Sequence, residues 1–185
     1  MKQPAIFVDR DGTLIEEVNY LSRVEDLRIF PFTGPALKLL KANGFLIIVV
    51  TNQSGIAREV YTEAAMQTVH DQIQAELGGA IDGFYFCPHL PDAGCRCRKP
   101  NLGMIDSARS DFDIDMKRSW VVGDKDLDVN LGKRAGTGTV MVMTGYGLKH
   151  KPFLEFDPDI FAEDLGQAAE QIVGTTSPAS VTLAP

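Results

Sequence analysis

Carboxylates that could catalyse a reaction follow two short apolar segments of the chain. Asp9 and Asp11 belong to the sequence D-R-D-G-T, directly after the apolar residues 5–8. Asp124 follows the apolar residues 120–123 in the same way. Carboxylate oxygens from two such positions suit Mg²⁺, which keeps several waters and accepts phosphate oxygens. The three residues are therefore candidate catalytic and Mg²⁺-binding groups, although a solvated turn or a helix N-cap would account for any one of them alone.

A second group of candidate ligands contains every cysteine of the chain. It consists of Cys87, His89, Cys95 and Cys97, in the sequence CPHLPDAGCRCRKP. Three thiolates and an imidazole make a complete tetrahedral set for Zn²⁺ with no position left for a substrate, so we expect a structural metal in loop 87–97. Ordinary buried thiols beside an unrelated histidine are the alternative. A bound zinc would rigidify the loop that carries the cations Arg98 and Lys99, which could then hold an anion.

Neutral polar side chains follow the longest apolar run. Residues 45–51 lead into the sequence T-N-Q-S-G, which contains Thr51, Asn52, Gln53 and Ser54. Hydroxyl and amide groups at the end of a strand can hold phosphate oxygens through hydrogen bonds, although a plain polar turn has the same composition. Lys99 and Lys125 would add the positive charge that a phosphate site needs.

Short apolar runs alternate with helical patterns and must position these groups. The expected strands are residues 5–8, 45–51, 84–86, 120–123 and 139–144. The runs are continuous rather than alternating, which is typical of parallel strands covered on both faces. The spacing of apolar residues predicts intervening helices that begin near Pro35, Thr62, Met104, Leu127 and Leu165. This order predicts an α/β fold, a doubly wound (Rossmann-like) parallel sheet with helices on both faces and its site beyond the carboxyl ends of the strands.

The 185 residues are enough for one domain with its own core. We expect that domain to span residues 1–174, with the small zinc-bound loop 87–97 inserted in it. No stretch between the motifs is long enough for a large cap domain. Residues 175–185 are rich in small residues and proline, which predicts a flexible tail.

The net charge of −7 disfavours nucleic acid as the main partner, because nucleic-acid affinity depends on many phosphate neutralisations. It does not exclude a small phosphorylated substrate. No apolar run approaches the ~20 residues that span a bilayer, and MKQPAIFVDRDG lacks an export signal. Cysteines at metal-ligand spacing suit a reducing compartment. We therefore expect a cytoplasmic protein with no membrane partner and, by default, a monomer.

Four segments of the chain resemble, in order, the motifs of the haloacid dehalogenase superfamily. They are FVDRDGT, VVTNQSG, the lysine of CRKP, and VVGDKDLD, within residues 5–147. With the zinc loop, they are most similar to the histidinol-phosphatase-like subfamily. The resemblance implies a Mg²⁺-dependent phosphatase that removes the 7-phosphate of D-glycero-D-manno-heptose 1,7-bisphosphate. Histidinol phosphate or another small phosphomonoester is the alternative substrate. A remote alternative function is that of a catalytically dead binding protein.

The resemblance also implies a role for each candidate residue. Asp9 would attack phosphorus and form a phosphoaspartate. Asp11 would protonate the leaving oxygen and then deprotonate the hydrolytic water, which requires a raised pKa. The side chains of Asp9 and Asp124, with the backbone carbonyl of Asp11, would hold Mg²⁺, and Thr51 and Lys99 would bind the transferring phosphoryl group. The remaining implied substrate contacts are Glu17, Val18, Asn19, Tyr20, Asn52, Gln53, Ser54, Arg98 and Lys125.

Residues outside these motifs receive structural interpretations. His70 lies beside the apolar stripe of the helix that begins near Thr62, so we interpret it as a helix-surface or core-edge residue. Asp128 is expected in the first turn of its helix, where it could hold groups of the metal site in place without binding the metal itself. Glu59 follows Arg58 at a position where the superfamily relatives usually have glycine.

Overall fold

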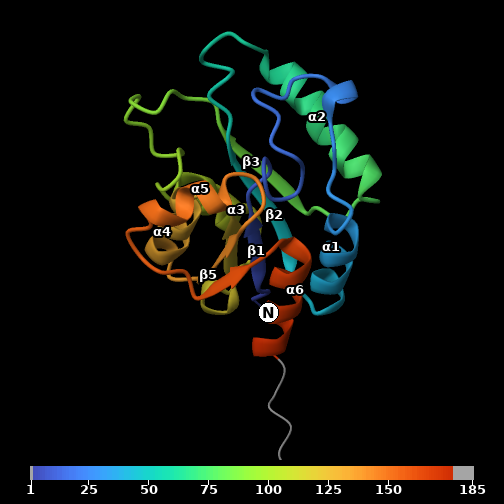
Figure 1. Ribbon diagram of the computed structural model, residues 1–185, viewed down its shortest axis with the longest axis vertical. Coiled ribbons are helices and arrows are strands. Elements are labelled where there is room, and N and C mark those ends of the chain that lie inside the picture. Colours follow the sequence, from blue (N-terminus) through green and yellow to red (C-terminus); the bar gives the residue numbers. More distant parts are fainter. Residues whose placement is uncertain (1, 177–185) are drawn as a thin grey trace, which may run out of the picture.

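Six parallel strands form the sheet at the centre of the molecule (Figure 1). Their spatial order is β3-β2-β1-β4-β5-β6. The computed structural model describes residues 2–176. The strands are β1 (Ala5–Val8), β2 (Leu46–Asn52), β3 (Gly83–Cys87), β4 (Trp120–Gly123), β5 (Gly138–Val142) and β6 (Ile160–Ala162). Every neighbouring pair is parallel. The predicted doubly wound sheet is therefore confirmed.

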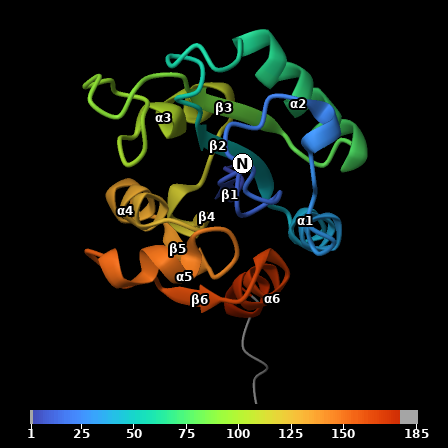
Figure 2. The ribbon, with the colours of Figure 1, turned by 45° about the horizontal axis from the view of Figure 1, so that its top comes forward.

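Helices cover both faces of this sheet (Figure 2). They are α1 (Thr33–Ala42), α2 (Glu63–Glu76), α3 (Gly103–Asp111), α4 (Asp126–Ala135), α5 (Gly147–His150) and α6 (Leu165–Thr176), with 3₁₀ turns η1 (Val24–Asp26), η2 (Met116–Arg118) and η3 (Lys151–Phe153). Ile6 and Val8 of β1 belong to the core beneath α1, α2 and α6. Phe7 belongs to the opposite core, beneath α3 and α4. Because both faces of the strand are buried, its sequence is apolar without alternation.

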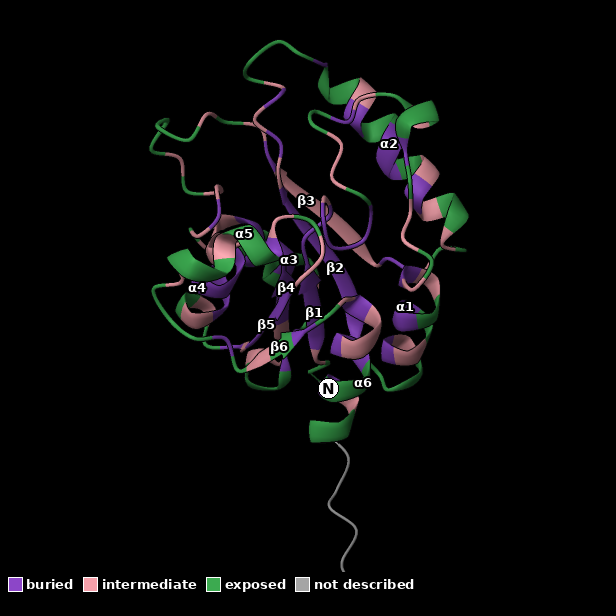
Figure 3. Cartoon of the chain, in the orientation of Figure 1, coloured by how far each residue is buried: buried purple, intermediate pink, exposed green. Residues whose placement is uncertain are grey.

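The burial of the helices follows the same pattern (Figure 3). Each long helix turns a buried face toward the sheet and an exposed face outward, as in α2, where Met66 and Val69 are fully buried. Thr62 caps this helix by accepting a hydrogen bond from the backbone N–H of Ala65 at 3.2 Å. Gly44, with a φ of +82°, follows α1 in the left-handed conformation expected of a helix C-terminus.

Two parts of the fold were not predicted from the sequence. Strand β6 has three residues and α5 has four, which is too short to give a recognisable periodicity. Helix α6 continues to Thr176, two residues into the predicted tail, and the rest of that tail, residues 177–185, lies outside the described residues. None of the helices in the described part of the chain combines the length and apolarity needed to cross a bilayer.

Two long loops stand above the carboxyl ends of the strands and surround the site (Figure 1). One joins β1 to α1 and the other joins β3 to α3. Across residues 2–176 these connections carry no strand or α-helix of their own, only the turn η1, so no large cap domain covers the sheet there. The site is therefore open except for these two loops and the shorter connections from β2 to α2 and from β5 to α5.

Candidate active site and metal centre

The carboxyl ends of β1 and β4 bring Asp9 and Asp124 together. These strands are neighbours, yet the chain passes through β2 and β3 between them, so the strand order reverses at this point. In open parallel sheets such a reversal leaves a crevice in which ligands bind. Thr51, in β2 next to β1, comes to the same edge of the sheet and is 1% exposed.

Lys99 lies between two buried carboxylates. Its Nζ is 2.9 Å from Oδ1 of Asp9 and 2.7 Å from Oδ1 of Asp128, and it donates a third hydrogen bond to the carbonyl of Val50. Burial alone would lower the pKa of Lys99, but the charges of Asp128 and Asp9 outweigh burial and raise it. The residue is therefore a fixed cation beside Asp9.

The backbone of Lys99 is held by β2. The backbone N–H of Lys99 donates to Oδ1 of Asn52 at 3.1 Å, and the Asn52 amide donates back to the Lys99 carbonyl at 3.5 Å. The Lys99–Pro100 peptide bond is cis. Asn52 thereby ties the end of the cysteine-containing loop to the strand that carries Thr51.

Asp124 offers an unused ligand atom to a cation. Its Oδ2 accepts the backbone N–H of Tyr146 at 2.7 Å, whereas its buried Oδ1 has no hydrogen-bond partner. Burial raises the pKa of Asp124 to about 7, against the lowering effect of Lys125, and the charge of Asp9 adds to the rise. A divalent cation would relieve this repulsion.

The carboxylates of Asp9, Asp124 and Asp128 lie close enough to share an ion, since each offers an oxygen within 4.8 Å of the others. Asp128, however, uses Oδ1 for Lys99 and Oδ2 for the backbone N–H of Lys125. In the described part of the chain, the hydrogen bond and the ion pair of the Asp9 carboxylate both use Oδ1, which accepts the Arg10 backbone N–H at 2.8 Å and faces Lys99. Asp9 and Asp124 are therefore the side chains that fit a metal.

Two glycines allow the backbone to approach Asp124. Gly12 and Gly145 have φ values of +84° and +54°. A Cβ atom on either residue would lie 2.3 Å from Oδ2 of Asp124. The hydroxyl of Thr144 donates to the Gly12 carbonyl at 2.6 Å and joins the two loops. Only glycine fits at both positions.

Asp11 is held by a neighbouring arginine, which corrects one prediction. Nε and Nη2 of Arg10 donate to the two oxygens of Asp11 at 3.0 and 2.9 Å, and Gln53 donates to Oδ2 at 2.8 Å. Burial raises the pKa of Asp11, but Arg10 and Gln53 outweigh burial and lower it. The sequence-based expectation of a raised pKa is therefore wrong for the substrate-free protein, because it did not foresee the arginine.

A cavity of about 210 Å³ opens above these groups. The predicted residues that line it are Asp9, Asp11, Glu17, Val18, Asn19, Tyr20, Thr51, Asn52, Gln53, Ser54, Lys99 and Lys125. Asp124 lies fully buried beneath the cavity. Arg98 does not line it: the structure places Arg98 on a neighbouring hollow, where it donates to the carbonyl of His89 at 3.2 Å.

Four polar or aromatic residues of this region were missed by the sequence analysis. Arg10, Tyr61 and Tyr146 line the cavity, and His70 contacts Arg10 at 3.1 Å. The interpretation of His70 as a helix-surface or core-edge residue is wrong, because it is 0% exposed and its partner is charged. Two of them had a signal in the sequence: Tyr146 follows a strand end and a glycine, and Arg10 lies between Asp9 and Asp11.

The rim of the cavity carries opposite charges and an aromatic ring. Nζ of Lys125 lies 3.5 Å from Glu17 and 5.1 Å from the centre of the Tyr146 ring. Tyr20 and Glu59, outside regular elements, have φ values of +59° and +58°. The left-handed conformation of Glu59 is one that glycine would adopt at lower cost.

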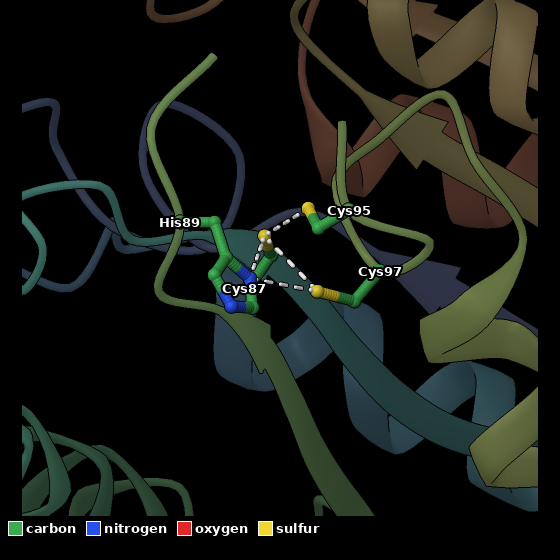
Figure 4. Close-up of side chains that lie close together, drawn as sticks. All are labelled: Cys87, His89, Cys95 and Cys97. Atoms are coloured by element: carbon green, nitrogen blue, oxygen red, sulfur yellow. Dashed lines mark hydrogen bonds between the residues drawn. The ribbon is translucent and has the colours of Figure 1, made fainter. Parts of the chain in front are cut away.

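The four predicted zinc ligands converge in space, Cys87 from the end of β3 and the other three from the loop that follows it (Figure 4). Sγ of Cys87 lies 3.5 Å from Cys95 Sγ and 3.2 Å from Cys97 Sγ, and His89 Nδ1 is 3.2 Å from Cys97 Sγ. Ligands about 2.3 Å from a tetrahedral zinc stand roughly 3.8 Å apart, close to these spacings. Burial raises the pKa of the Cys87 thiol to about 12, so a cation is needed to keep it a thiolate.

Comparisons with known proteins agree with this geometry. A family profile described as HAD-hydrolase-like matches residues 96–168. The chain is 38% identical over 195 residues to the D-glycero-D-manno-heptose-1,7-bisphosphate 7-phosphatase of Thermosynechococcus vestitus, covering 96% of this chain and 100% of the relative. It is 41% identical over 153 residues to the D-glycero-beta-D-manno-heptose-1,7-bisphosphate 7-phosphatase of Escherichia coli strain K12, covering 77% and 80%.

A solved structure also matches the fold over nearly its whole length. It is the D,D-heptose 1,7-bisphosphate phosphatase from B. bronchiseptica, complexed with magnesium and phosphate. The TM-score is 0.84 at 30% identity, and the match covers 95% of this chain and 99% of the other.

Proposed function

The chain belongs to the D,D-heptose 1,7-bisphosphate phosphatases of the haloacid dehalogenase-like hydrolases, and from this we propose that it removes the 7-phosphate of D-glycero-D-manno-heptose 1,7-bisphosphate through Asp9. The observation that carries the proposal is the buried Asp9–Lys99 pair at the reversal of strand order, inside a cavity that is open to a small soluble substrate. We infer the identity of the substrate from the names of these relatives.

In the first step Asp9 acts as the nucleophile. Its Oδ2 attacks phosphorus and forms an acyl phosphate, while the bond from phosphorus to the sugar oxygen breaks and its electron pair stays on that oxygen. Asp11 gives the leaving oxygen its proton. The bound phosphoryl group places negative charge beside Asp11, and a like charge raises the pKa of a carboxyl, so Asp11 takes up this proton as substrate binds.

In the second step Asp11 acts as the base. It removes a proton from water, the resulting hydroxide attacks phosphorus, and the bond from phosphorus to Asp9 breaks to release inorganic phosphate. The lowered pKa of Asp11 in the substrate-free protein favours the ionised form that this step needs once the sugar has left. Lys99 and the hydroxyl of Thr51 bind the phosphoryl oxygens throughout.

Mg²⁺ fits the residues present, because the buried Oδ1 of Asp124 has no hydrogen-bond partner and only the Nζ of Lys125, 3.6 Å away, pairs with it. Asp9 and Asp124 would hold it with the Asp11 backbone carbonyl. When bound, Mg²⁺ neutralises charge on the phosphoryl group and on the clustered carboxylates. Lys125 and Glu17, at the rim, would contact the sugar.

We assign a structural Zn²⁺ to Cys87, His89, Cys95 and Cys97. The convergence of their ligand atoms within 4.8 Å supports the assignment. The ion would fix the loop that ends at Lys99. The cluster contains no disulfide, which suits a reducing compartment such as the cytoplasm. A monomer is expected, and light scattering after size-exclusion chromatography measures this.

The test is phosphate release with Mg²⁺ from four substrates: both anomers of heptose 1,7-bisphosphate, histidinol phosphate and fructose 1,6-bisphosphate. We expect a preference for one heptose anomer, with ³¹P NMR showing that the 1-phosphate remains. A preference for histidinol phosphate would keep the mechanism but replace the substrate. No release from any of them would overturn the proposal and favour a binding protein of the same fold.

A further inference from the structure

A buried arginine connects the acid–base residue to a helix outside the cavity. Arg10 is 1% exposed, and its guanidinium reaches three different groups. Nε and Nη2 bind Asp11, Nη2 also donates to Oε1 of Gln53 at 3.1 Å, and Nη1 lies 3.1 Å from Nε2 of His70 on α2. His70 itself does not line the cavity.

The protonation of His70 follows from its surroundings. Arg10 has only donors, so Nε2 of His70 must accept and the ring proton sits on Nδ1. Burial, and then the charge of Arg10, lower the pKa of His70 to about 3, against the weaker opposing effects of Asp11 and Asp71. The imidazole is therefore a neutral acceptor at any working pH.

The environment of His70 is poorly explained by packing alone. Its ring stacks on Phe84 with 4.6 Å between centroids, a contact that phenylalanine could also make. Its buried Nδ1 has no hydrogen-bond partner in the described structure, which costs free energy. The one polar contact that histidine makes and phenylalanine could not is the hydrogen bond from Arg10.

We propose that His70 is a positioning residue that acts through Arg10 to fix the orientation of the Asp11 carboxylate. The inference rests on the proposed function, in which Asp11 transfers the proton. With His70 present, the guanidinium is held at Nη1 while Nε and Nη2 grip Asp11 in a bidentate pair. Without the acceptor, the buried Nη1 loses its hydrogen-bond partner. The guanidinium then rotates toward a different acceptor, and the Asp11 carboxylate rotates with it.

The test compares His70→Phe with His70→Gln. Phenylalanine keeps the ring and its stacking but removes the acceptor, whereas the Oε1 of glutamine can replace Nε2. We measure kcat/KM, which reports the steps up to formation of the phosphoaspartate, on heptose bisphosphate and on p-nitrophenyl phosphate. The nitrophenolate leaves without a proton, so only the sugar substrate needs Asp11 as an acid in this step.

We expect His70→Phe to lower kcat/KM on the sugar by about tenfold or more, with little change on p-nitrophenyl phosphate. His70→Gln should regain most of the loss. Asp11→Asn should show the same dependence on the leaving group, and His70→Phe added to Asp11→Asn should cause no further loss, because both act through one group.

Equal losses on both substrates, or a full additional loss in the double variant, would show that His70 merely supports the fold. Equal activity of the Phe and Gln variants on the sugar would also overturn the proposal. If the wild type does not hydrolyse p-nitrophenyl phosphate, two measurements on the sugar substrate test the proposal instead: the activity of the double variant and the recovery of activity in His70→Gln. Thermal unfolding then checks that the variants remain stable. An inactive wild type would instead contradict the proposed function.

Discussion

The ammonium group of Lys99 lies 2.9 Å from the carboxylate of Asp9, and both side chains are almost completely buried. Asp128 holds the other side of the ammonium group at 2.7 Å. The three residues come from a loop, a strand end and a helix N-terminus that are distant in sequence. Their contact makes the proposed nucleophile part of a buried ionic network.

Asp9→Asn should reduce turnover by about 10³-fold or more, because an amide cannot form the phosphoaspartate. The fold should persist, since Asp128 still pairs with Lys99. Phosphate release and circular dichroism measure the two effects. Asp92→Asn, on the exposed part of the cysteine loop, is the control and should keep full activity. Near-normal rates for Asp9→Asn would remove Asp9 as the nucleophile.

Lys99→Met should abolish activity and lower the free energy of unfolding by about 3 kcal/mol, because it leaves buried carboxylates without a cation. Chemical denaturation measures the loss. Adding Asp128→Asn to Lys99→Met should recover part of the stability but none of the activity. If the double variant were less stable by the sum of both single losses, Lys99 and Asp128 would not be coupled.

Gly145→Ala should destroy activity through Asp124. The new Cβ would lie 2.3 Å from Oδ2 of Asp124, so the carboxylate must move. Gly136→Ala is the matched control, because Gly136 also has a positive φ, of +70°, but open space around it. Both variants should lose about 1 kcal/mol of stability from the left-handed backbone. Only Gly145→Ala should also weaken Mg²⁺ binding, measured by calorimetry.

Cys95→Ser should lower the zinc content and the melting temperature, by roughly 5 °C, because one of four ligands is lost. Elemental analysis and thermal unfolding measure these changes. Asp92→Ser, on the same loop, should change neither. Wild-type protein purified without any bound zinc would contradict the assignment of the cluster.

His70 should make the stability depend on pH. Its pKa is about 3 when folded and near 6.5 when unfolded, so between these values the unfolded chain binds one more proton and stability falls as the pH falls. From pH 7 to pH 5 the wild type should lose about 2 kcal/mol more than His70→Gln. Parallel curves for wild type and His70→Gln would mean that His70 titrates normally.

The sheet and much of the candidate site could be predicted from the sequence because both are encoded locally. Continuous apolar runs marked the strands, and polar residues such as Asp9, Thr51 and Asp124 stand directly after or at the end of them. The cysteine cluster lies within residues 87–97, from the end of β3 into the following loop, so its spacing alone predicted four converging ligands. The short elements β6 and α5 left no comparable pattern.

Only the tertiary structure decided how these groups act on one another. No local pattern indicates that Arg10 folds back onto Asp11, or that His70, one more residue on an amphipathic helix, reaches Arg10. The direction of the Asp11 pKa shift depends on those contacts, and so does the pairing of Lys99 with Asp128. Side-chain types and their order along the chain are local properties, whereas burial and charge–charge distances arise only when distant segments pack together.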